Sequence, residues 1–206
     1  MNIEIKITKK PIEYHLAIKK LEERVLGVKE HDKPELIWIL KHKAVYTGGT
    51  SFSKKDILEK DINVLKTNRG GKITYHDPGQ LIFYFVINLN KRKKDIRWFV
   101  NVVEKTVIQT LKFYNIKSFA DKKNIGIWIN HQNEIKKISS IGLKVKKWII
   151  YHGFSINIST NLKGFKKIVP CGIKNRQVTN LKEIKNSNFL NLNKVLISNF
   201  LKNLEG

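Results

Sequence analysis

The segment from Leu81 to Leu89 constrains the fold of this chain most. It reads Leu-Ile-Phe-Tyr-Phe-Val-Ile-Asn-Leu, so residues on both sides of an extended chain are apolar. A run of this length is too short for most buried helices and is typical of a strand with both faces covered. It therefore predicts a central strand of a sheet. Leu36 to Leu40 predicts a second buried strand.

The remaining periodicities predict three helices and three more strands. The expected helices are an N-terminal one bearing Tyr14, Ile18, Leu21 and Val25 and ending near Gly27, a second from Trp98 to Tyr114 bearing Val100, Val103, Val107 and Leu111, and a last one bearing Leu192, Leu196, Phe200 and Leu204. The expected strands are 125–129, 138–145 and 149–158, the last with His152, Phe154, Ile156 and Ile158 on one face. Helices at the ends and in the middle, with strands between them, predict an α+β fold with a mixed β-sheet flanked by helices.

Length and composition favour one folded domain over residues 1–206. No Pro/Gly/Ser-rich linker and no internal repeat divides the chain. No apolar run approaches the ~20 residues that span a bilayer, and residues 1–6 are followed by no signal-peptide core. With a single cysteine, the expected location is the cytoplasm.

The charge is strongly basic, with 40 Lys and Arg against 17 Asp and Glu and a formal net charge of +23. Such a surface attracts nucleic acid, anionic membranes or acidic proteins. Compositional drift is an equally good explanation, because lysine, isoleucine and asparagine are abundant throughout. The excess is spread along the chain, with one local cluster at Lys91-Arg92-Lys93-Lys94.

Cys171 is the only cysteine, and it lies in Ile168-Val169-Pro170-Cys171-Gly172-Ile173. It can form no intramolecular disulfide, so it is either a small buried apolar residue or a nucleophile. Pro170 restricts the backbone on one side and Gly172 leaves the other side open. This setting favours a thiol on a bend that a substrate can reach.

A glycine-rich segment, Arg69 to Gln80, lies between two predicted strands and reads Arg-Gly-Gly-Lys-Ile-Thr-Tyr-His-Asp-Pro-Gly-Gln. Turns at Gly70-Gly71 and at Asp77-Pro78-Gly79 would explain its glycines and its proline. They leave unexplained why Arg69, Tyr75 and His76 crowd the same loop, so a ligand-binding loop is favoured. The spacing of a Walker phosphate loop is missing.

Lys137 precedes small residues and an apolar strand in Lys136-Lys137-Ile138-Ser139-Ser140-Ile141-Gly142. Its ammonium is expected near the floor of a pocket, where a cation beside a cysteine favours the reactive thiolate. His152 and Gly153 belong to a third segment of interest, 151–157. A Cys–His pair using His76 or His152 remains an alternative, as does a buried, satisfied His152. Zinc held by these side chains is disfavoured, because no pair has a short ligand spacing.

Taken together, these segments resemble one family, lipoate-protein ligase B, the octanoyl-acyl-carrier-protein:protein N-octanoyltransferases. The resemblance covers about residues 12 to 182. Six blocks match in order: His42-Lys43-Ala44-Val45-Tyr46-Thr47-x-Gly49, Arg69-Gly70-Gly71-x-x-Thr74-Tyr75-His76-x-Pro78-Gly79-Gln80, Gly126-Ile127-Trp128-Ile129, Lys137-Ile138-x-Ser140-Ile141-Gly142, His152-Gly153-Phe154 and Pro170-Cys171-Gly172-Ile173.

The resemblance implies the fold of the biotin/lipoate protein ligase catalytic domain and a two-step acyl transfer. Cys171 would take the octanoyl group from acyl carrier protein as a thioester, and a lipoyl-domain lysine would then take it as an amide. Lys137 would activate the thiol and relay protons. The implied substrate-binding residues are Arg69, Gly70, Gly71, Lys72, Ile73, Thr74, Tyr75, His76, Ser140, Ile141, Gly142, Gly153, Phe154 and Ser155.

The same resemblance implies no cofactor and no metal, and a monomer that contacts neither nucleic acid nor membrane. The implied partners are octanoyl-acyl carrier protein, lipoyl domains of 2-oxo acid dehydrogenase E2 subunits and the glycine cleavage H protein. Asp77 departs from the family, which usually has glycine there. Lys41 to Ala44 departs too, because the family more often carries an acid and prolines.

The chemistry of the residues agrees with this activity. Thioester exchange is nearly isoenergetic, so the reaction needs no ATP. Backbone N–H groups near Gly172 or in the Gly70-Gly71 loop could stabilise an oxyanion. Phe154 and Ile141 could form an apolar slot for an eight-carbon chain. Because acyl carrier proteins are acidic, the positive charge could steer the donor.

Two other functions stay open on the sequence alone. An ATP-dependent lipoate or biotin ligase would share the fold and the glycine-rich loop but would need no cysteine nucleophile. A basic nucleic-acid binder is suggested by charge alone, and no helix-turn-helix, zinc-finger or RNA-recognition motif supports it.

Overall fold

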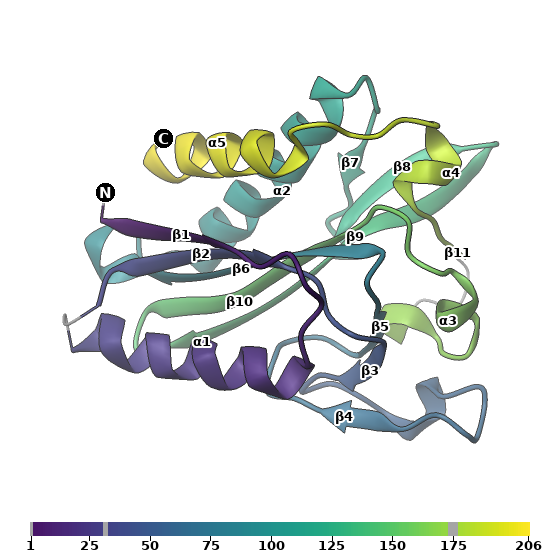
Figure 1. Ribbon diagram of the computed structural model, residues 1–206, viewed down its shortest axis with the longest axis horizontal. Helices are drawn as coiled ribbons and strands as arrows, with labels where there is room; N and C mark the ends of the chain where they lie inside the picture. The colour runs from purple at the N-terminus through teal and green to yellow at the C-terminus, as the bar shows by residue number, and fades with distance from the viewer. Residues whose placement is uncertain (1, 31–32, 173–176) are drawn as a thin grey trace.

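A computed structural model describes residues 2–30, 33–172 and 177–206, and a mixed β-sheet forms its centre (Figure 1). The strands follow the order β1-β2-β6-β10-β9-β8-β7, and β11 pairs with β9 off this path. Their bounds are β1 Ile3–Ile7, β2 Glu35–Leu40, β6 Gln80–Asn88, β7 Phe119–Ala120, β8 Ile127–His131, β9 Glu134–Lys146, β10 Ile149–Asn157 and β11 Gln177–Val178. The pairs β1–β2 and β9–β11 are parallel and the others antiparallel.

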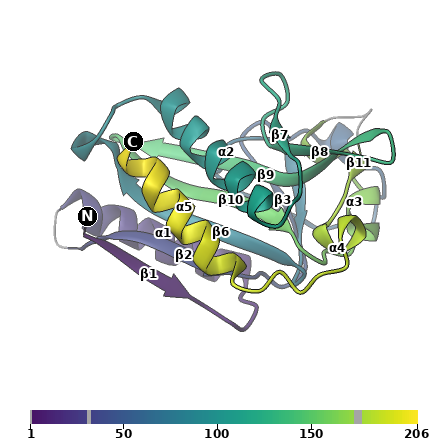
Figure 2. The ribbon, with the colours of Figure 1, turned by 90° about the horizontal axis from the view of Figure 1, so that it is seen from above.

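Helices cover both faces of this sheet. Helix α1, Tyr14–Lys29, lies on one face, and α2, Ile96–Phe113, and α5, Leu192–Glu205, lie on the other (Figures 1 and 2). Two single-turn helices, α3 Lys163–Lys166 and α4 Leu181–Ile184, and three 3-10 turns, η1 Lys54–Asp56, η2 Leu89–Lys91 and η3 Pro170–Gly172, complete the helical segments described. The predicted α+β architecture is confirmed, with α1 running two residues beyond Gly27.

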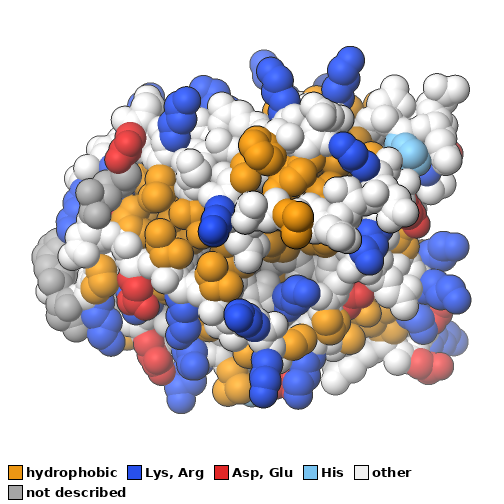
Figure 3. All heavy atoms as spheres, turned by 45° about the horizontal axis from the view of Figure 1, so that its top comes forward, with side chains coloured by type: hydrophobic (Ala, Val, Ile, Leu, Met, Phe, Trp, Pro, Cys, Tyr) orange, Lys and Arg blue, Asp and Glu red, His pale blue; other side chains and the backbone are white. Residues whose placement is uncertain are grey.

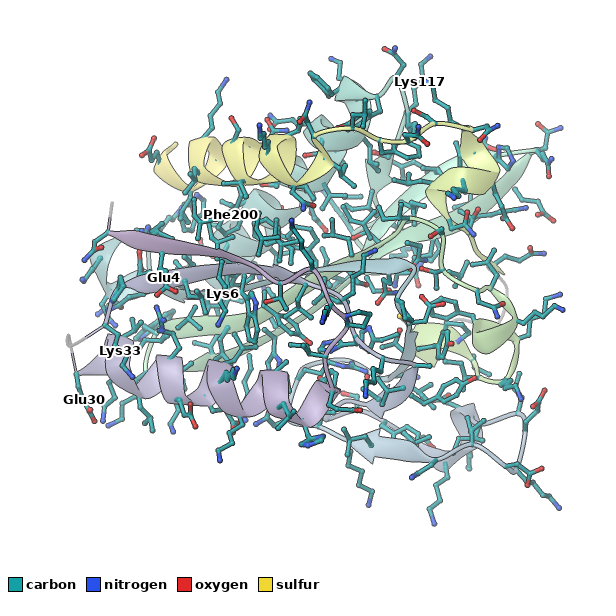
Figure 4. The ribbon with its side chains drawn as sticks, in the orientation of Figure 1. Glu4, Lys6, Glu30, Lys33, Lys117 and Phe200 are labelled. Carbon is teal, nitrogen blue, oxygen red and sulfur yellow. The ribbon has the colours of Figure 1, made fainter. Side chains whose placement is uncertain are left out.

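Strand β6 is central and buried along its whole length, as its sequence predicts. Phe83 and Phe85 pack on the α2–α5 side, where they meet Phe99 and Phe200. Tyr84 faces α1 instead, with Ile82 and Val86. Figure 4 shows Phe200 pointing from α5 toward the sheet. Because each face of β6 has its own core, both alternating sets of residues are apolar.

A second, three-stranded sheet carries the glycine-rich segment. Its strands are β3 Val45–Gly48, β4 Val64–Lys66 and β5 Ile73–His76, in the order β4-β3-β5. Part of the segment predicted as a loop is therefore a strand. The following turn closes with a hydrogen bond from Gln80 N–H to Asp77 C=O at 3.0 Å and leads straight into β6.

Asp77, which replaces the glycine usual in the family, stabilises this turn. Its buried carboxylate accepts hydrogen bonds from Gly79 N–H at 3.0 Å and from Asn161 N–H at 2.8 Å. The side chain thus links the turn to the loop that follows β10. With aspartate at this position the turn is still formed, and the side chain adds a hydrogen bond to Asn161.

The expected alternation along β10 fails at His152. Phe154 and Ile156 belong to the core beneath α2 and α5. The ring of His152 instead stacks on Tyr151, and its Nε2 lies 2.9 Å from Asn68 Oδ1. His152 has φ 70°, a left-handed conformation that turns its side chain away from the face its position predicts.

The surface carries the excess positive charge in a dispersed form. Figure 3 shows Lys and Arg side chains over the whole visible face, around a group of hydrophobic side chains near its middle. Ile5 and Ile7 of β1 are about half exposed. Within the described residues, no helix has both the length and the apolar character needed to cross a bilayer.

Candidate active site

Cys171 lies on the 3-10 turn η3 and is partly exposed. Its φ of 56° places it in the left-handed region, so the thiol stands on a tight bend rather than inside a regular element. The turn is fixed at its start, because Val169 N–H donates to Asp56 C=O at 2.8 Å and Ile168 forms a bridge with Ile57. Ile173, which completes the motif, lies outside the described residues.

Lys137 brings a buried ammonium group to this thiol. The residue lies on β9 and is 4% exposed. Its Nζ donates to Cys171 Sγ at 3.2 Å and to Ile125 C=O at 2.9 Å, and it lies 5.1 Å from the centre of the Trp128 ring. A cation this close to a thiol stabilises the thiolate, and the carbonyl and ring offset the cost of burying the charge.

Gly126 makes room for the lysine side chain. A Cβ at this position would lie 2.5 Å from Lys137 Cε and 2.7 Å from Ser139 C=O, and its φ of 136° is one that L side chains rarely adopt. Only glycine therefore fits. The sequence flags Gly126 in a matching block, but the reason for it is visible only in three dimensions.

A cavity of about 440 Å³ is lined in part by Cys171 and Lys137. Its volume lies within the range of small-molecule sites, and most of its lining is apolar. Every residue predicted for substrate binding lines it except Tyr75. Tyr75 packs instead against Tyr46 and Phe165 in a separate small core.

Several residues that line the cavity were missed by the sequence reasoning. They are Tyr14, Ile82, Tyr84, Ile96, Val100, Lys123, Asn124, Ile125 and Leu143. His152, which the sequence offered only as an alternative partner of Cys171, also lines the cavity. Ile125 and Leu143 directly adjoin the matched blocks, so their position in the sequence could have suggested that they line the cavity. The contributions of α1 and α2 depend on tertiary packing, and no local pattern marks them.

The Gly70-Gly71 segment lies along the edge of β9. Strand β8 pairs with residues 134–139 of β9, and farther along Gly70 N–H donates to Leu143 C=O at 3.0 Å. The guanidinium of Arg69 donates to Thr47 C=O at 2.7 Å and Thr47 Oγ1 at 2.9 Å. The arginine thus anchors the loop to the second sheet.

Two of the expected oxyanion donors are already used. Gly70 N–H donates to Leu143, as above, and Gly172 N–H donates to Val169 C=O at 3.0 Å. These two N–H groups already have acceptors, so the expected oxyanion donors stay a prediction for the other N–H groups near Gly172 and in the loop.

The neighbouring strand β6 explains why position 153 is a glycine. A Cβ there would lie 1.9 Å from Phe83 C=O, so the main chain of β6 approaches too closely for any side chain. A glycine in mid-strand is typical of a place where a ligand or another backbone approaches closely, and here it is the backbone of β6. Gly153 also contributes to the lining of the cavity.

Three buried histidines surround the inner part of the site without contacting the thiol through any hydrogen bond described. His76 Nδ1 lies 2.6 Å from Gln80 Oε1, His42 Nε2 lies 2.9 Å from Tyr84 Oη, and His152 bonds Asn68. Burial lowers the pKa of His42 to about 4 and the pKa values of His76 and His152 to about 3. These rings are neutral at pH 7, and the group paired with Cys171 is Lys137.

Acid is expected to destabilise the fold through these histidines. Between pH 6.5 and about 4, these imidazoles become protonated in the unfolded chain but stay neutral in the folded one, because folding lowers their pKa values. The free energy of unfolding should then fall by roughly 1.4 kcal/mol per pH unit for each buried histidine, and by about 4 kcal/mol per unit for all three. Urea unfolding at pH 8, 7, 6 and 5 measures this slope.

A His152→Gln variant should lessen the slope by about one third, since one of three groups is removed. His15→Gln is the matched control, because His15 is exposed on α1. An unchanged slope for His152→Gln would contradict the assignment.

The described residues contain no group of three or more His, Cys, Asp or Glu side chains placed to hold a metal ion. The site offers a thiol beside an ammonium, and both side chains line a mainly apolar cavity. Such a pair of groups suits covalent acyl transfer.

The fold and this site place the chain in the class of lipoyl and biotin protein ligase catalytic domains. A bipartite lipoate protein ligase from Thermoplasma acidophilum superposes with a TM-score of 0.77 at 16% identity, covering 100% of this chain and 84% of that one. A lipoate-protein ligase A bound with ATP gives a TM-score of 0.78 at 16% identity, covering 100% of this chain and 86% of its own. At such low identity these likenesses show the fold alone.

Sequence comparison defines the family within this class. The Lipoyl protein ligase A/B catalytic domain family matches residues 14–201. An octanoyltransferase of Orientia tsutsugamushi strain Ikeda is 46% identical over 177 residues, 84% of this chain and 85% of that protein. One of Wolbachia pipientis wMel is 40% identical over 179 residues, 86% and 87% of the two chains. The chain belongs to the octanoyltransferase family, and the resemblance read from its motifs is confirmed.

Proposed function

We propose that this protein transfers an octanoyl group from octanoyl-acyl carrier protein to a lysine of a lipoyl domain, by way of a thioester on Cys171. The observation that carries the proposal is the 3.2 Å contact between Lys137 Nζ and Cys171 Sγ, two residues that line the cavity. Membership of the octanoyltransferase family supplies the acyl group. This is the first step of endogenous protein lipoylation.

In the first half-reaction the Cys171 thiolate attacks the carbonyl carbon of the donor thioester. A tetrahedral oxyanion forms and collapses, the bond to the carrier's sulfur breaks, and the octanoyl group remains on Cys171. The ammonium of Lys137 gives a proton to the departing thiolate, which leaves as a thiol. Lys137 is then a neutral amine.

In the second half-reaction the ε-amine of the lipoyl-domain lysine attacks the Cys171 thioester. Lys137 takes the proton that this amine loses as the amide forms, and the Cys171 thiolate departs. Both groups thereby return to their starting states. One thioester is exchanged for another and then for a more stable amide, so neither ATP nor any cofactor enters the cycle.

The cavity suits an extended apolar chain. Along β9, the six residue-to-residue steps from Lys137 to Leu143 span roughly 20 Å at ~3.3 Å per step. An extended eight-carbon chain with bonds of ~1.5 Å spans roughly 9 Å, so it fits along the strand with room for the thioester. The residues proposed to line it are Arg69, Gly70, Gly71, Lys72, Ile73, Thr74, His76, Ser140, Ile141, Gly142, Gly153, Phe154 and Ser155, with Tyr75 supporting the strand from its other side.

Charge supports an acidic donor. The chain carries a net charge of +23, and Lys72 and Lys123 line the cavity itself. Acyl carrier proteins are acidic, and complementary charge accelerates encounter. The proposed acceptors are the lipoyl domains of 2-oxo acid dehydrogenase E2 subunits and the glycine cleavage H protein.

The proposal also covers organisation and location. Strand β1 pairs with β2 near one end of the chain, and α5 packs on α2 near the other, which supports one catalytic domain over residues 1–206. We place this domain in the cytoplasm as a monomer, where acyl carrier protein and a reduced thiol are available together.

Mass spectrometry after mixing with octanoyl-acyl carrier protein tests the function directly. The expected result is a single octanoyl adduct, removed by hydroxylamine and located on the peptide that contains Cys171. Adding a lipoyl domain should discharge the adduct and yield an octanoylated lysine. A chain that forms no adduct while still octanoylating the lipoyl domain would overturn the covalent route.

A further inference from the structure

A buried hydrogen-bond chain runs from the glycine-rich loop into the sheet. The Arg69 guanidinium donates to Thr47 Oγ1 at 2.9 Å, and Thr47 Oγ1 lies 3.3 Å from His76 Nε2. His76 Nδ1 lies 2.6 Å from Gln80 Oε1. Gln80 Nε2 then donates to Asn157 Oδ1 at 2.7 Å. The chain therefore crosses from the second sheet to β6 and β10.

The same chain ends at the main chain of Lys137. Asn157 Nδ2 donates to Thr179 C=O at 2.9 Å, and Thr179 N–H donates to Lys137 C=O at 2.9 Å. Val178, just before Thr179, pairs with Lys137 in the parallel β9–β11 ladder. Both the carbonyl and the amide of Thr179 are therefore hydrogen-bonded. The amide bonds directly to Lys137, whose Nζ contacts the thiol.

All side-chain bonds in this chain point in one direction. Gln80 Oε1 can only accept, so His76 Nδ1–H donates to it. Burial lowers the pKa of His76 to about 3, so the ring is neutral at pH 7 and its Nε2 accepts from the Thr47 hydroxyl. The Arg69 guanidinium and the Gln80 and Asn157 amide nitrogens act only as donors.

The middle of the chain is shielded from water. Gln80 is 1% exposed and Asn157 4% exposed. Partners buried in a low-dielectric interior cannot be replaced by solvent, so a broken link leaves an unsatisfied group that the main chain must move to relieve. A break at Asn157 leaves the Thr179 carbonyl unpaired, next to Lys137.

We propose that Gln80 and Asn157 are positioning residues for acyl transfer, which hold the main chain of Lys137 in register with the Arg69-Gly70-Gly71 loop. Neither side chain touches the thiol through any bond described; each acts through Thr179. The chain fixes two parts of the site with one set of bonds, the ammonium that activates Cys171 and the loop that lines the cavity. The inference rests on the proposed role of Lys137.

The test substitutes Asn157→Asp, which keeps size and replaces the Nδ2 donor by an oxygen facing the Thr179 carbonyl. Asn180→Asp is a matched control, because Asn180 is also buried and its Nδ2 donates to a different carbonyl, that of Thr160, at 3.1 Å. Both variants lose the same amide donor, but only Asn157 belongs to the hydrogen-bond chain that ends at Lys137. Asn157→Leu removes the donor without adding charge and serves if the aspartate variant folds poorly.

For Asn157→Asp and Asn157→Leu we expect kcat to fall about 10- to 100-fold, as for other residues that orient a reactive group, with KM changed less than about threefold. The pH profile of Cys171 alkylation by iodoacetamide should move to higher pH. Asn180→Asp should match the loss of unfolding free energy but keep the wild-type kcat and alkylation profile.

If the Asn157 variants keep the wild-type alkylation profile and kcat per folded molecule, the positioning role is refuted. Wild-type protein that forms no octanoyl adduct on Cys171 would refute the proposed function instead. The two failures are thus read from different samples, the variants in the first case and the unmodified protein in the second.

Discussion

A Cys171→Ser variant is expected to lose octanoyl transfer by at least ~10³-fold, because a hydroxyl beside Lys137 is not ionised at neutral pH and is a far weaker nucleophile than a thiolate. The octanoyl adduct should disappear from its mass spectrum. The fold should persist, since Cys171 lies on a partly exposed turn and its side chain is replaced by one of similar shape. Transfer is measured by octanoylation of a lipoyl domain.

The same variant separates the transferase from an ATP-dependent ligase. The enzyme class left open by the sequence is an ATP-dependent ligase, which would need no cysteine nucleophile. Cys171→Ser should therefore fail with ATP and free octanoate as well as with octanoyl-acyl carrier protein. Activity with ATP and free acid that survives the substitution would sink the thioester mechanism.

A Lys137→Met variant should transfer octanoyl groups about 10² to 10⁴-fold more slowly, the range for loss of a general acid–base group. Alkylation of Cys171 at pH 7 should slow as well, because the ammonium 3.2 Å from Sγ no longer favours the thiolate. The fold should not weaken, since an apolar side chain of similar length replaces a buried charge. Urea unfolding checks this last point.

Lys137→Arg is the informative companion. Arginine keeps the positive charge but stays protonated, so it should preserve more of the alkylation rate than of turnover. Equal losses in both assays for the arginine variant would argue that Lys137 supplies charge alone and moves no proton.

Local sequence patterns predicted the main sheet and its helices because these elements carry complete apolar stripes. The apolar run from Leu81 to Leu89 predicts β6. The four residues that the periodicity of α5 predicts to be buried are buried in the structure. The strands β1, β3, β4, β5, β7 and β11 were not predicted. Each is five residues or shorter and gains its stability from the strand beside it.

The motifs single out Cys171 and Lys137, but the contact between the two side chains was beyond the sequence. Lys137 and Cys171 are 34 positions apart, and Gln80 and Asn157 are 77 apart. Only the folded sheet brings such residues together. His152 shows the complementary limit, because one left-handed residue reverses the face that strict alternation assigns.

The solitary cysteine has a redox consequence. In the proposed mechanism Cys171 reacts as a thiolate, which is also the form that peroxides oxidise to a sulfenic acid. The chain has no second cysteine to trap that sulfenic acid as an internal disulfide, so recovery depends on a thiol from solution. In that mechanism, the lysine that prepares Cys171 for acylation also exposes it to irreversible over-oxidation wherever external reductant runs out.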